Sequence, residues 1–243
     1  MNNYNLITNY LNHEYRDSEK KVIKVLDFGC GSGELVRLLL GDGYDAYGAD
    51  VYYEGKYHKP QEDLFNRRVF KMAPNNIPFE NEYFDVIITN MVFEHVENLS
   101  LVLSEIARVC NRGGMVISVF PLKNTWYEGH AGVYFLHWFK QGSKLQKKYY
   151  QLYNSLMGAK TKLERKEQIN FLEKWTHYRS LSEVKVCFKK VNFENLKFIE
   201  SFFFDFKVGS KWPFLTKILT RGVKRIIVQK MAFYAFSYTK RNF

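Results

Sequence analysis

The stretch VLDFGCGSGELVRLLL, residues 25–40, changes from an apolar run to a glycine cluster and then to a helical pattern. A tight turn from a buried strand into a helix leaves the first helical N–H groups unpaired, at the positive end of the helix dipole. Gly29, Gly31 and Gly33 lack a Cβ, so the backbone there can pass close to another molecule. The stretch therefore predicts a strand, a ligand-binding loop and a helix.

Short apolar runs alternate with helical patterns through the first half of the chain. We expect strands at 22–29, 45–51, 84–90 and 115–121, helices at 33–41 and 100–114, and two final strands at 196–206 and 232–240. This order predicts an α/β protein with a Rossmann-like, mainly parallel sheet and helices on both faces. Ligands of such sheets bind beyond the carboxyl ends of the strands.

Composition and charge restrict the class of protein. The 243 residues are 46% hydrophobic and 25% charged, which is typical of a soluble globular protein with one main domain, here residues 1–243. Neither a leader pattern nor a run of about eighteen apolar residues occurs, so we expect a cytoplasmic protein. Cys30, Cys110 and Cys187 form no close pair, which predicts reduced thiols and no metal site.

The net charge of +11 is unevenly distributed. Residues 140–243 carry 23 Lys and Arg against 7 Asp and Glu, whereas residues 1–139 carry 13 against 18. The basic character therefore belongs to the C-terminal part of the chain.

The residues around the glycine loop discriminate between ligand classes. A phosphate-binding loop of nucleotide hydrolases needs Lys and then Ser or Thr after its last glycine, but Glu34 follows Gly33. The spacing also departs from the GxGxxG of dinucleotide-binding loops. Asp27, just before the loop, suits a cationic or amine-bearing ligand better than a pyrophosphate.

Three further motifs accompany the loop: Asp50 at the end of the second strand, IPFENEYFDVIITNMVFEHV at 77–96 and EIARVCNRGGMVISVFP at 105–121. With them, residues 22–121 resemble the cofactor-binding core of class I S-adenosylmethionine-dependent methyltransferases, in the branch of the ubiquinone and menaquinone enzymes. The resemblance implies S-adenosyl-L-methionine as cofactor, an antiparallel last strand, and Asp50 on the ribose hydroxyls. The cofactor-binding residues that it implies are Asp27, Gly29, Cys30, Gly31, Gly33, Asp50, Val51, Asn75, Asn90 and Met91.

One position departs from the family pattern. An acidic residue usually stands four positions before the LPF-like element and contacts the adenine amine, but here that position is Ala73. We expect Asn75 or a backbone group to take over this contact.

The catalytic candidates lie outside the glycine loop. A sulfonium already activates the methyl group, so the enzyme mainly positions the acceptor, and a hydroxyl acceptor also needs a base. Residues 122–180 lie outside the shared core and predict an inserted helical substrate cap. Within the cap, Glu128, His130 and His137 are candidates, with His130 the first choice as base; His95, after the fourth strand, is another. A structural role remains open for each of these histidines.

The resemblance leaves three functions open. A Glu and His pair with a later HWF is weakly similar to methyltransferases of bacterial surface-glycan synthesis, which favours O-methylation of a sugar hydroxyl in a glycan or lipid-linked saccharide. The alternative is methylation of a quinone or other lipid-like small molecule. A nucleic-acid methyltransferase or binding module ranks third, because no recognised RNA-binding motif accompanies the basic charge.

Residues 207–231 form a basic amphipathic insertion between the last two expected strands. Apolar residues recur at spacings of three and four, and Lys217, Lys224 and Arg225 are among the cations on the opposite faces. The pattern predicts a helix with one of two partners. It could lie on an anionic membrane surface, at the inner face of the membrane, or it could pack on the protein's own sheet or on a second subunit in a homodimer.

Overall fold

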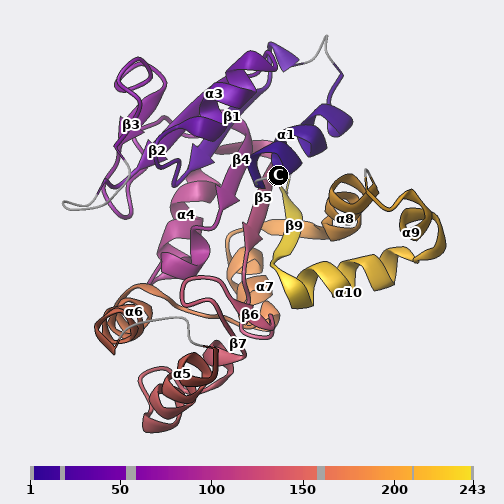
Figure 1. Cartoon of the computed structure of the whole chain (residues 1–243). Coiled ribbons are helices and arrows are strands. Elements are labelled where there is room, and N and C mark those ends of the chain that lie inside the picture. Colours follow the sequence, from indigo (N-terminus) through magenta and orange to yellow (C-terminus); the bar gives the residue numbers. More distant parts are fainter. Residues whose placement is uncertain (1–2, 17–19, 53–58, 158–161, 210, 242–243) are drawn as a thin grey trace.

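A seven-stranded sheet forms the centre of the computed structural model, which describes residues 3–16, 20–52, 59–157, 162–209 and 211–241. Its order is β3-β2-β1-β4-β5-β9-β8 (Figure 1). The neighbours among β1 to β5 pair in parallel, and β9 runs antiparallel to β5 and β8. The predicted Rossmann-like α/β fold with an antiparallel last strand is confirmed. The strands are β1 (Lys24–Phe28), β2 (Asp45–Asp50), β3 (Val69–Lys71), β4 (Phe84–Asn90), β5 (Cys110–Phe120), β8 (Phe193–Phe198) and β9 (Tyr234–Lys240).

Helices cover both faces of this sheet. One layer contains α1 (Asn3–Glu14), α3 (Glu34–Gly41) and α8 (Glu200–Gly209), and the other contains α4 (Leu99–Val109) and α7 (Leu181–Lys190). Successive side chains of a strand point to opposite faces, so Val25 packs under the first layer and Leu26 under the second. Both faces of the sheet are therefore buried. A ligand can reach the sheet only at the ends of its strands.

The segment between β5 and α7, which the sequence predicts as a cap, lies away from the sheet at the bottom of Figure 1. It contains β6 (Tyr127–Glu128), β7 (Val133–Tyr134), the 3-10 turn η2 (Leu136–Trp138), α5 (Lys144–Met157) and α6 (Lys162–Trp175). Its small core is built from Ala131, Val133, Leu136, Tyr150, Ile169 and Leu172. The two ends of this segment meet, because the Lys123 amide donates to the Arg179 carbonyl at 2.9 Å.

Two predicted element boundaries are wrong. Helix α4 ends at Val109, and Cys110 already pairs with Phe84 of β4, so the predicted helix 100–114 is too long. The Lys240 ammonium from β9 ends this helix by donating to the carbonyls of Ala107 and Cys110, at 2.8 and 2.7 Å.

The predicted strand 196–206 becomes a helix after Phe198. The Glu200 carboxylate, which is buried at the start of α8, accepts from the Ala235 amide at 3.1 Å and from Gln229 Nε2 at 2.8 Å. These bonds turn the chain away from the sheet. A continuous apolar run fits a buried helix as well as a strand, and here the tertiary contacts of Glu200 favour the helix.

The basic amphipathic segment forms two helices, α9 (Pro213–Ile218) and α10 (Arg221–Met231), because Thr220 caps the second one by accepting from the Val223 amide. Lys224 points inward, contrary to prediction, and pairs with Asp205 at 2.6 Å.

Most of the large apolar side chains of this segment face outward, so the expectation that the stripe packs on the protein's own sheet is wrong for them; Leu215 and Leu219 are half-buried, and Val228 packs against the core. The large exposed ones are Trp212, Phe214, Ile218, Val223, Ile226, Ile227 and Met231. Among the described residues, no helix is both long enough and apolar enough to cross a membrane.

Candidate active site

The glycine loop follows β1 and leads into α3 with a left-handed backbone. Gly29, Gly31 and Gly33 have φ angles of +78°, +53° and +85°, which residues with a side chain rarely adopt. A Cβ on Gly29 would lie 2.4 Å from Val92 Cγ2. The loop thus needs glycine at position 29 both for its conformation and for its contact with the chain beyond β4.

Asp50 ends β2 beside this loop, as the sequence predicts. Its Oδ2 accepts from the Gly31 amide at 2.9 Å, and its Oδ1 accepts from the Tyr52 amide at 3.1 Å. The Tyr52 hydroxyl donates back to the Gly31 carbonyl at 2.6 Å. The predicted residue Val51, directly after Asp50, is half-buried and packs against the core of the second layer. The carboxylate is therefore held in place at the carboxyl ends of the strands.

Two ionisable groups under the loop are kept neutral by their surroundings. Asp27 is only 3% exposed, and burial, together with the charge of Asp50, raises its pKa to about 8. Burial and the Asp27 charge also raise the pKa of the buried Cys30 thiol. A cation bound beside Asp27 would favour the ionised carboxylate, so this end of the sheet fits the positively charged groups of S-adenosylmethionine.

The first helix also reaches this site, which the sequence does not predict. Tyr4 of α1 lies near Asp27, Cys30 and Glu34, whose charges add to the burial that raises its pKa. Asn3 Nδ2 donates to Asn90 Oδ1 at 3.2 Å. No motif in α1 signals this role, because the helix reaches the loop only by packing across α3 and the sheet.

The other predicted cofactor residues occupy the ends of β3 and β4. Met91, directly after Asn90, has φ +55°, and its amide donates to the Val119 carbonyl at 2.7 Å. Asn75 is exposed in the turn after β3, where it lines a surface hollow with Glu97 and Arg179. Its contact with adenine stays a prediction.

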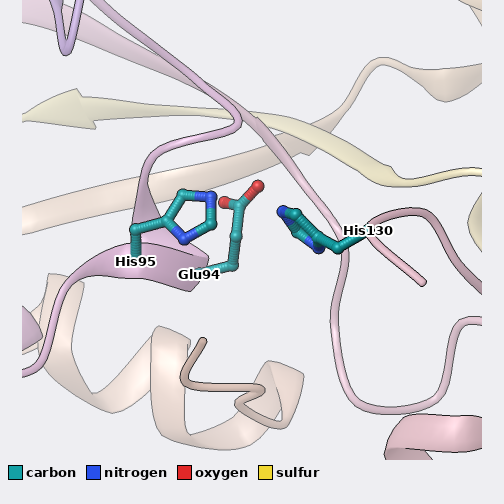
Figure 2. Close-up of side chains that lie close together, drawn as sticks. All are labelled: Glu94, His95 and His130. Carbon is teal, nitrogen blue, oxygen red and sulfur yellow. The ribbon is translucent and has the colours of Figure 1, made fainter. Parts of the chain in front are cut away.

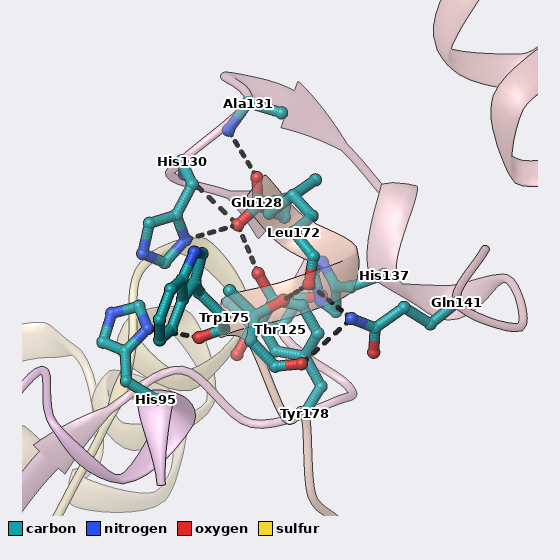
Figure 3. Close-up of polar contacts among 11 residues, drawn as sticks. His95, Thr125, Glu128, His130, Ala131, His137, Gln141, Leu172, Trp175 and Tyr178 are labelled. Carbon is teal, nitrogen blue, oxygen red and sulfur yellow. Dashed lines mark hydrogen bonds and ion pairs between the residues drawn. The ribbon is translucent and has the colours of Figure 1, made fainter. Parts of the chain in front are cut away.

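A buried acid and a histidine form the centre of the second half of the site, in the hairpin of the cap (Figure 3). Glu128 Oε1 lies 2.7 Å from His130 Nδ1 and also accepts from the Tyr178 hydroxyl, while Oε2 accepts from the Ala131 amide at 2.5 Å. Burial opposes ionisation of Glu128, but its bonds to His130, Tyr178 and Ala131 outweigh burial and lower its pKa. Burial likewise opposes protonation of His130, yet the bond and charge of Glu128 raise the histidine's pKa.

Glu94 and His95 face this pair from η1 (Phe93–His95), the 3-10 turn after β4. His95 Nδ1 lies 2.7 Å from the Trp175 carbonyl, and the His95 and His130 rings are 5.1 Å apart. Glu94 is 1% exposed, and burial raises its pKa to about 7. One ligand atom each from Glu94, His95 and His130 lies within 4.8 Å of the others (Figure 2).

His137 is placed differently from the other candidates. It is buried behind Glu128, where its Nε2 donates to the Thr125 carbonyl at 2.7 Å and its ring lies against Tyr178. Burial lowers its pKa. A neutral, enclosed imidazole suits a positioning role for the hairpin rather than contact with an acceptor.

Arg179, which the sequence gives no reason to single out, joins the end of the cap to η1. Its guanidinium donates to the carbonyls of Phe93 and Glu97, both at 2.8 Å, and to that of Val96. The His177 amide adds a bond to the Glu94 carbonyl at 2.6 Å. Cap and sheet thus build the Glu94, His95 and His130 cluster together.

Comparison with known proteins identifies the family. A methyltransferase domain profile matches residues 6–197, which is most of the chain. The chain belongs to the methyltransferase domain family. The predicted class I resemblance is thereby confirmed, and so is the prediction of an enzyme that uses S-adenosylmethionine.

The methyltransferase is similar to curated enzymes of quinone synthesis over part of their length. It is 27% identical over 136 residues to a ubiquinone biosynthesis O-methyltransferase of Bartonella bacilliformis, covering 52% of this chain and 54% of that protein. It is 29% identical over 137 residues to a demethylmenaquinone methyltransferase of Leptospira interrogans, covering 52% and 55%. The chain spans about half the length of the curated relatives it matches.

Solved structures share the fold across the whole methyltransferase. An S-adenosylmethionine-dependent methyltransferase from Mesorhizobium loti has a TM-score of 0.57 at 13% identity and covers 96% of both chains. A putative one from Listeria monocytogenes has a TM-score of 0.55 at 14% identity and covers 99% of both. At these identities the likeness describes the fold and leaves the acceptor to be argued from the site.

Proposed function

We propose that this methyltransferase transfers a methyl group to the oxygen of an acceptor hydroxyl at the Glu94, His95 and His130 cluster. The observation that carries the proposal is the bond between His130 Nδ1 and the buried Glu128 carboxylate. An ionised carboxylate only accepts hydrogen bonds, so Nδ1 carries the proton, and Nε2 of neutral His130 is left as an acceptor. An oriented imidazole of this kind can take the proton of a hydroxyl.

The donor half of the reaction is assigned to the glycine loop. S-adenosylmethionine, when bound, supplies a methyl group that its sulfonium already activates. Gly29, Gly31 and Gly33 open the backbone for it, Asp50 offers a carboxylate to the ribose hydroxyls, and Asp27 faces the cationic groups. Val92, which touches the position of a Gly29 Cβ, stands two residues before Glu94. This short connection supports placing the acceptor cluster next to the donor.

The residues around His130 then have defined roles. His130 takes the hydroxyl proton as the acceptor oxygen bonds to the methyl carbon, and Glu128 stabilises the resulting imidazolium. Tyr178 and the Ala131 amide hold Glu128 in position. Tyr178 and Ala131 act through Glu128, so they are positioning residues.

Two acceptor classes are in accord with this arrangement. The first is a phenolic hydroxyl of a quinone precursor, which the similarity to the Bartonella O-methyltransferase supports. The second is a sugar hydroxyl, as the sequence predicts; the partly exposed rings of Trp126, Tyr134 and Trp138 in the cap could stack on a pyranose. We place the phenolic acceptor first.

Donor binding and methyl transfer test the proposal separately. S-adenosylhomocysteine should bind the purified protein in isothermal titration, and Asp50→Ala should weaken binding. Radiolabelled methyl transfer to a panel of phenols, catechols and saccharides should yield an O-methyl ether. His130→Ala should lower turnover by about 10²-fold with unchanged donor affinity. A product methylated on carbon or nitrogen, or full turnover by His130→Ala, would contradict the proposal.

We also propose that α9 and α10 bring the enzyme to an anionic membrane surface at the cytoplasmic side. Phe214 and Ile218 are 51% and 71% exposed, and the exposed cations Lys217 and Arg221 lie on the same two helices. Apolar insertion and attraction to anionic lipids would act together there. The Trp126 amide donates to the Lys230 carbonyl at 2.7 Å, so α10 ends beside the cap. A lipid-like acceptor would then be delivered near the cluster.

Vesicle sedimentation tests this surface. The protein should co-sediment with phosphatidylglycerol vesicles at low salt but not with pure phosphatidylcholine. Reversal of Lys217 and Arg221 to Glu should weaken binding at least about tenfold, since each cation near the surface contributes about 1 kcal/mol. Reversal of Lys189 and Lys190 on α7 is the charge-matched control. A dimer that Ile226→Asp dissociates, with no vesicle binding, would assign the surface to a second copy instead.

A further inference from the structure

We infer that Glu94, His95 and His130 form a binding site for one divalent transition-metal ion. Within the described residues, this is the one group of three or more His, Cys, Asp or Glu side chains close enough to share an ion. The cysteine pattern predicts no metal, and none of the three cysteines takes part. Two imidazoles and one carboxylate are a ligand set that suits first-row divalent ions.

The hydrogen bonds of the two histidines orient them for such an ion. His95 Nδ1 donates to the Trp175 carbonyl and His130 Nδ1 donates to Glu128, each at 2.7 Å. With both Nδ1 atoms engaged, Nε2 is the nitrogen that each ring presents to the cluster (Figures 2 and 3). A metal-binding histidine commonly donates its other N–H to a carbonyl or carboxylate in this way.

Glu94 supplies an independent reason to place a ligand there. Its side chain is 1% exposed, and within the described structure its Oε2 has no hydrogen-bond partner. A buried carboxylate oxygen without a partner is costly, and a bound cation removes that cost. Figure 2 shows this carboxylate between the two imidazoles.

The two elements that carry the ligands are fixed to one another. Glu94 and His95 belong to η1, whose carbonyls accept from Arg179, and His130 lies in the hairpin whose carboxylate, Glu128, also accepts from Tyr178. The ligand atoms are within 4.8 Å of one another before any ion binds. Ligand atoms about 2.1 Å from one tetrahedral ion are about 3.4 Å apart, so the separations of up to 4.8 Å must shorten by up to about 1.4 Å, which rotation of the three side chains can supply.

The site deepens the proposed function, and only the role of the ion rests on that proposal. Three protein ligands leave coordination positions open for acceptor oxygens. An ion there would lower the pKa of a bound hydroxyl, whose proton then passes to water. One lone pair cannot serve both purposes, so His130 Nε2 acts as the base only in the metal-free protein; in the metal-bound protein it would be a ligand, and the ion would replace it as the group that activates the hydroxyl.

Metal titration of the untagged, chelator-treated protein tests the site without any methyl transfer. Co²⁺ should bind at about one ion per chain with the visible absorption of a protein-bound ion, and Zn²⁺ should displace it. Mg²⁺ should compete weakly, because it prefers oxygen ligands. Absence of saturable Co²⁺ and Zn²⁺ binding would overturn the inference.

Three substitutions assign the ligands. His95→Asn and His130→Asn keep a donor near the Nδ1 position and remove Nε2, and Glu94→Gln keeps the shape of the side chain. Each should weaken Co²⁺ binding at least about tenfold while circular dichroism stays unchanged. His13→Asn, on α1, is the matched control. Binding that survives all three substitutions would locate the ion elsewhere and overturn the site.

Activity then separates this inference from the proposed function. Methyl transfer that stops with chelator and returns with Co²⁺ or Zn²⁺ supports the role of the ion. Full transfer by the metal-free protein would overturn that role and leave O-methylation by His130 in place. Metal binding without transfer to any hydroxyl would support the site and count against the proposed function.

Discussion

Asp27 lies under the glycine loop, and its burial makes the stability of the ligand-free protein depend on pH. The carboxyl has a pKa of about 8 in the folded protein, raised by burial and by the charge of Asp50, against about 3.9 in an unfolded chain. Between these values the folded state binds one proton more than the unfolded state. The free energy of unfolding therefore falls as pH rises, by up to about 1.4 kcal/mol per pH unit, and levels off above pH 8.

Asp27→Asn removes this titration while keeping the shape of the side chain. Linkage between the two pKa values predicts that, from pH 6 to pH 8, the parent loses about 2 kcal/mol of stability relative to the variant. Urea unfolding at several pH values, without ligand, measures the difference. Asp42→Asn, which removes a surface carboxylate, controls for the loss of one negative charge.

A difference in stability between parent and Asp27→Asn that stays constant from pH 6 to pH 8 would refute this reasoning. It would mean that Asp27 is ionised in the folded protein at neutral pH. A bound donor provides a second test of the ionisation of Asp27. If its cationic part faces Asp27, saturating S-adenosylhomocysteine should reduce the pH dependence in the parent and leave the variant unchanged.

Two other substitutions have definite outcomes. Gly29→Ala places a methyl group 2.4 Å from Val92 Cγ2 at φ +78°, so it should lower the free energy of unfolding by about 1 to 3 kcal/mol and weaken S-adenosylhomocysteine binding in calorimetry. Gly41→Ala, with no atom within 4 Å of the added methyl, is the control, and equal losses in both would contradict the steric argument. Arg179→Ala should cost about 2 to 4 kcal/mol in urea unfolding, because the carbonyls of Phe93, Val96 and Glu97 lose a charged donor. Arg179→Lys should restore only part of the lost free energy of unfolding. Full stability of the alanine variant would show that water replaces the guanidinium.

The positions of the residues proposed to bind the donor are the part that the sequence predicts well. Asp27, the glycines and Asp50 stand at the ends of two neighbouring parallel strands, so strand order alone brings them to one edge of the sheet. The ends of β4 and β5 follow from the same alternation of apolar runs and helical patterns. Such local periodicity can be recognised in the sequence without knowledge of the tertiary structure.

The acceptor half depends on contacts between distant parts of the chain. Glu94 and His130 lie near one another only because the cap folds back onto η1 and Arg179 holds it there. The sequence makes His130 a candidate base but gives no sign that His95 and Glu94 face it. Nothing in the sequence around Trp175 marks the carbonyl that orients His95.

The predicted orientation of the C-terminal helix is wrong for a similar reason. Periodicity places Lys224 on a polar face, and polar faces usually meet water. Here Asp205 of α8 offers a partner that draws the ammonium inward. Val223, Ile226 and Ile227 of α10 are consequently left exposed, which reverses the usual relation between pattern and burial.

The hydrogen bond between Lys123 and Arg179 closes the cap at its base, which matters for how the cap can evolve or be engineered. An insertion whose ends are already hydrogen-bonded to each other leaves the host sheet undisturbed when its length changes, because the entropy of closing a loop grows slowly with loop length. Segments of different size and shape can be exchanged between these two residues. Under the roles proposed above for cap and sheet, selection can thus change the choice of acceptor in one exchangeable unit while the donor site stays the same.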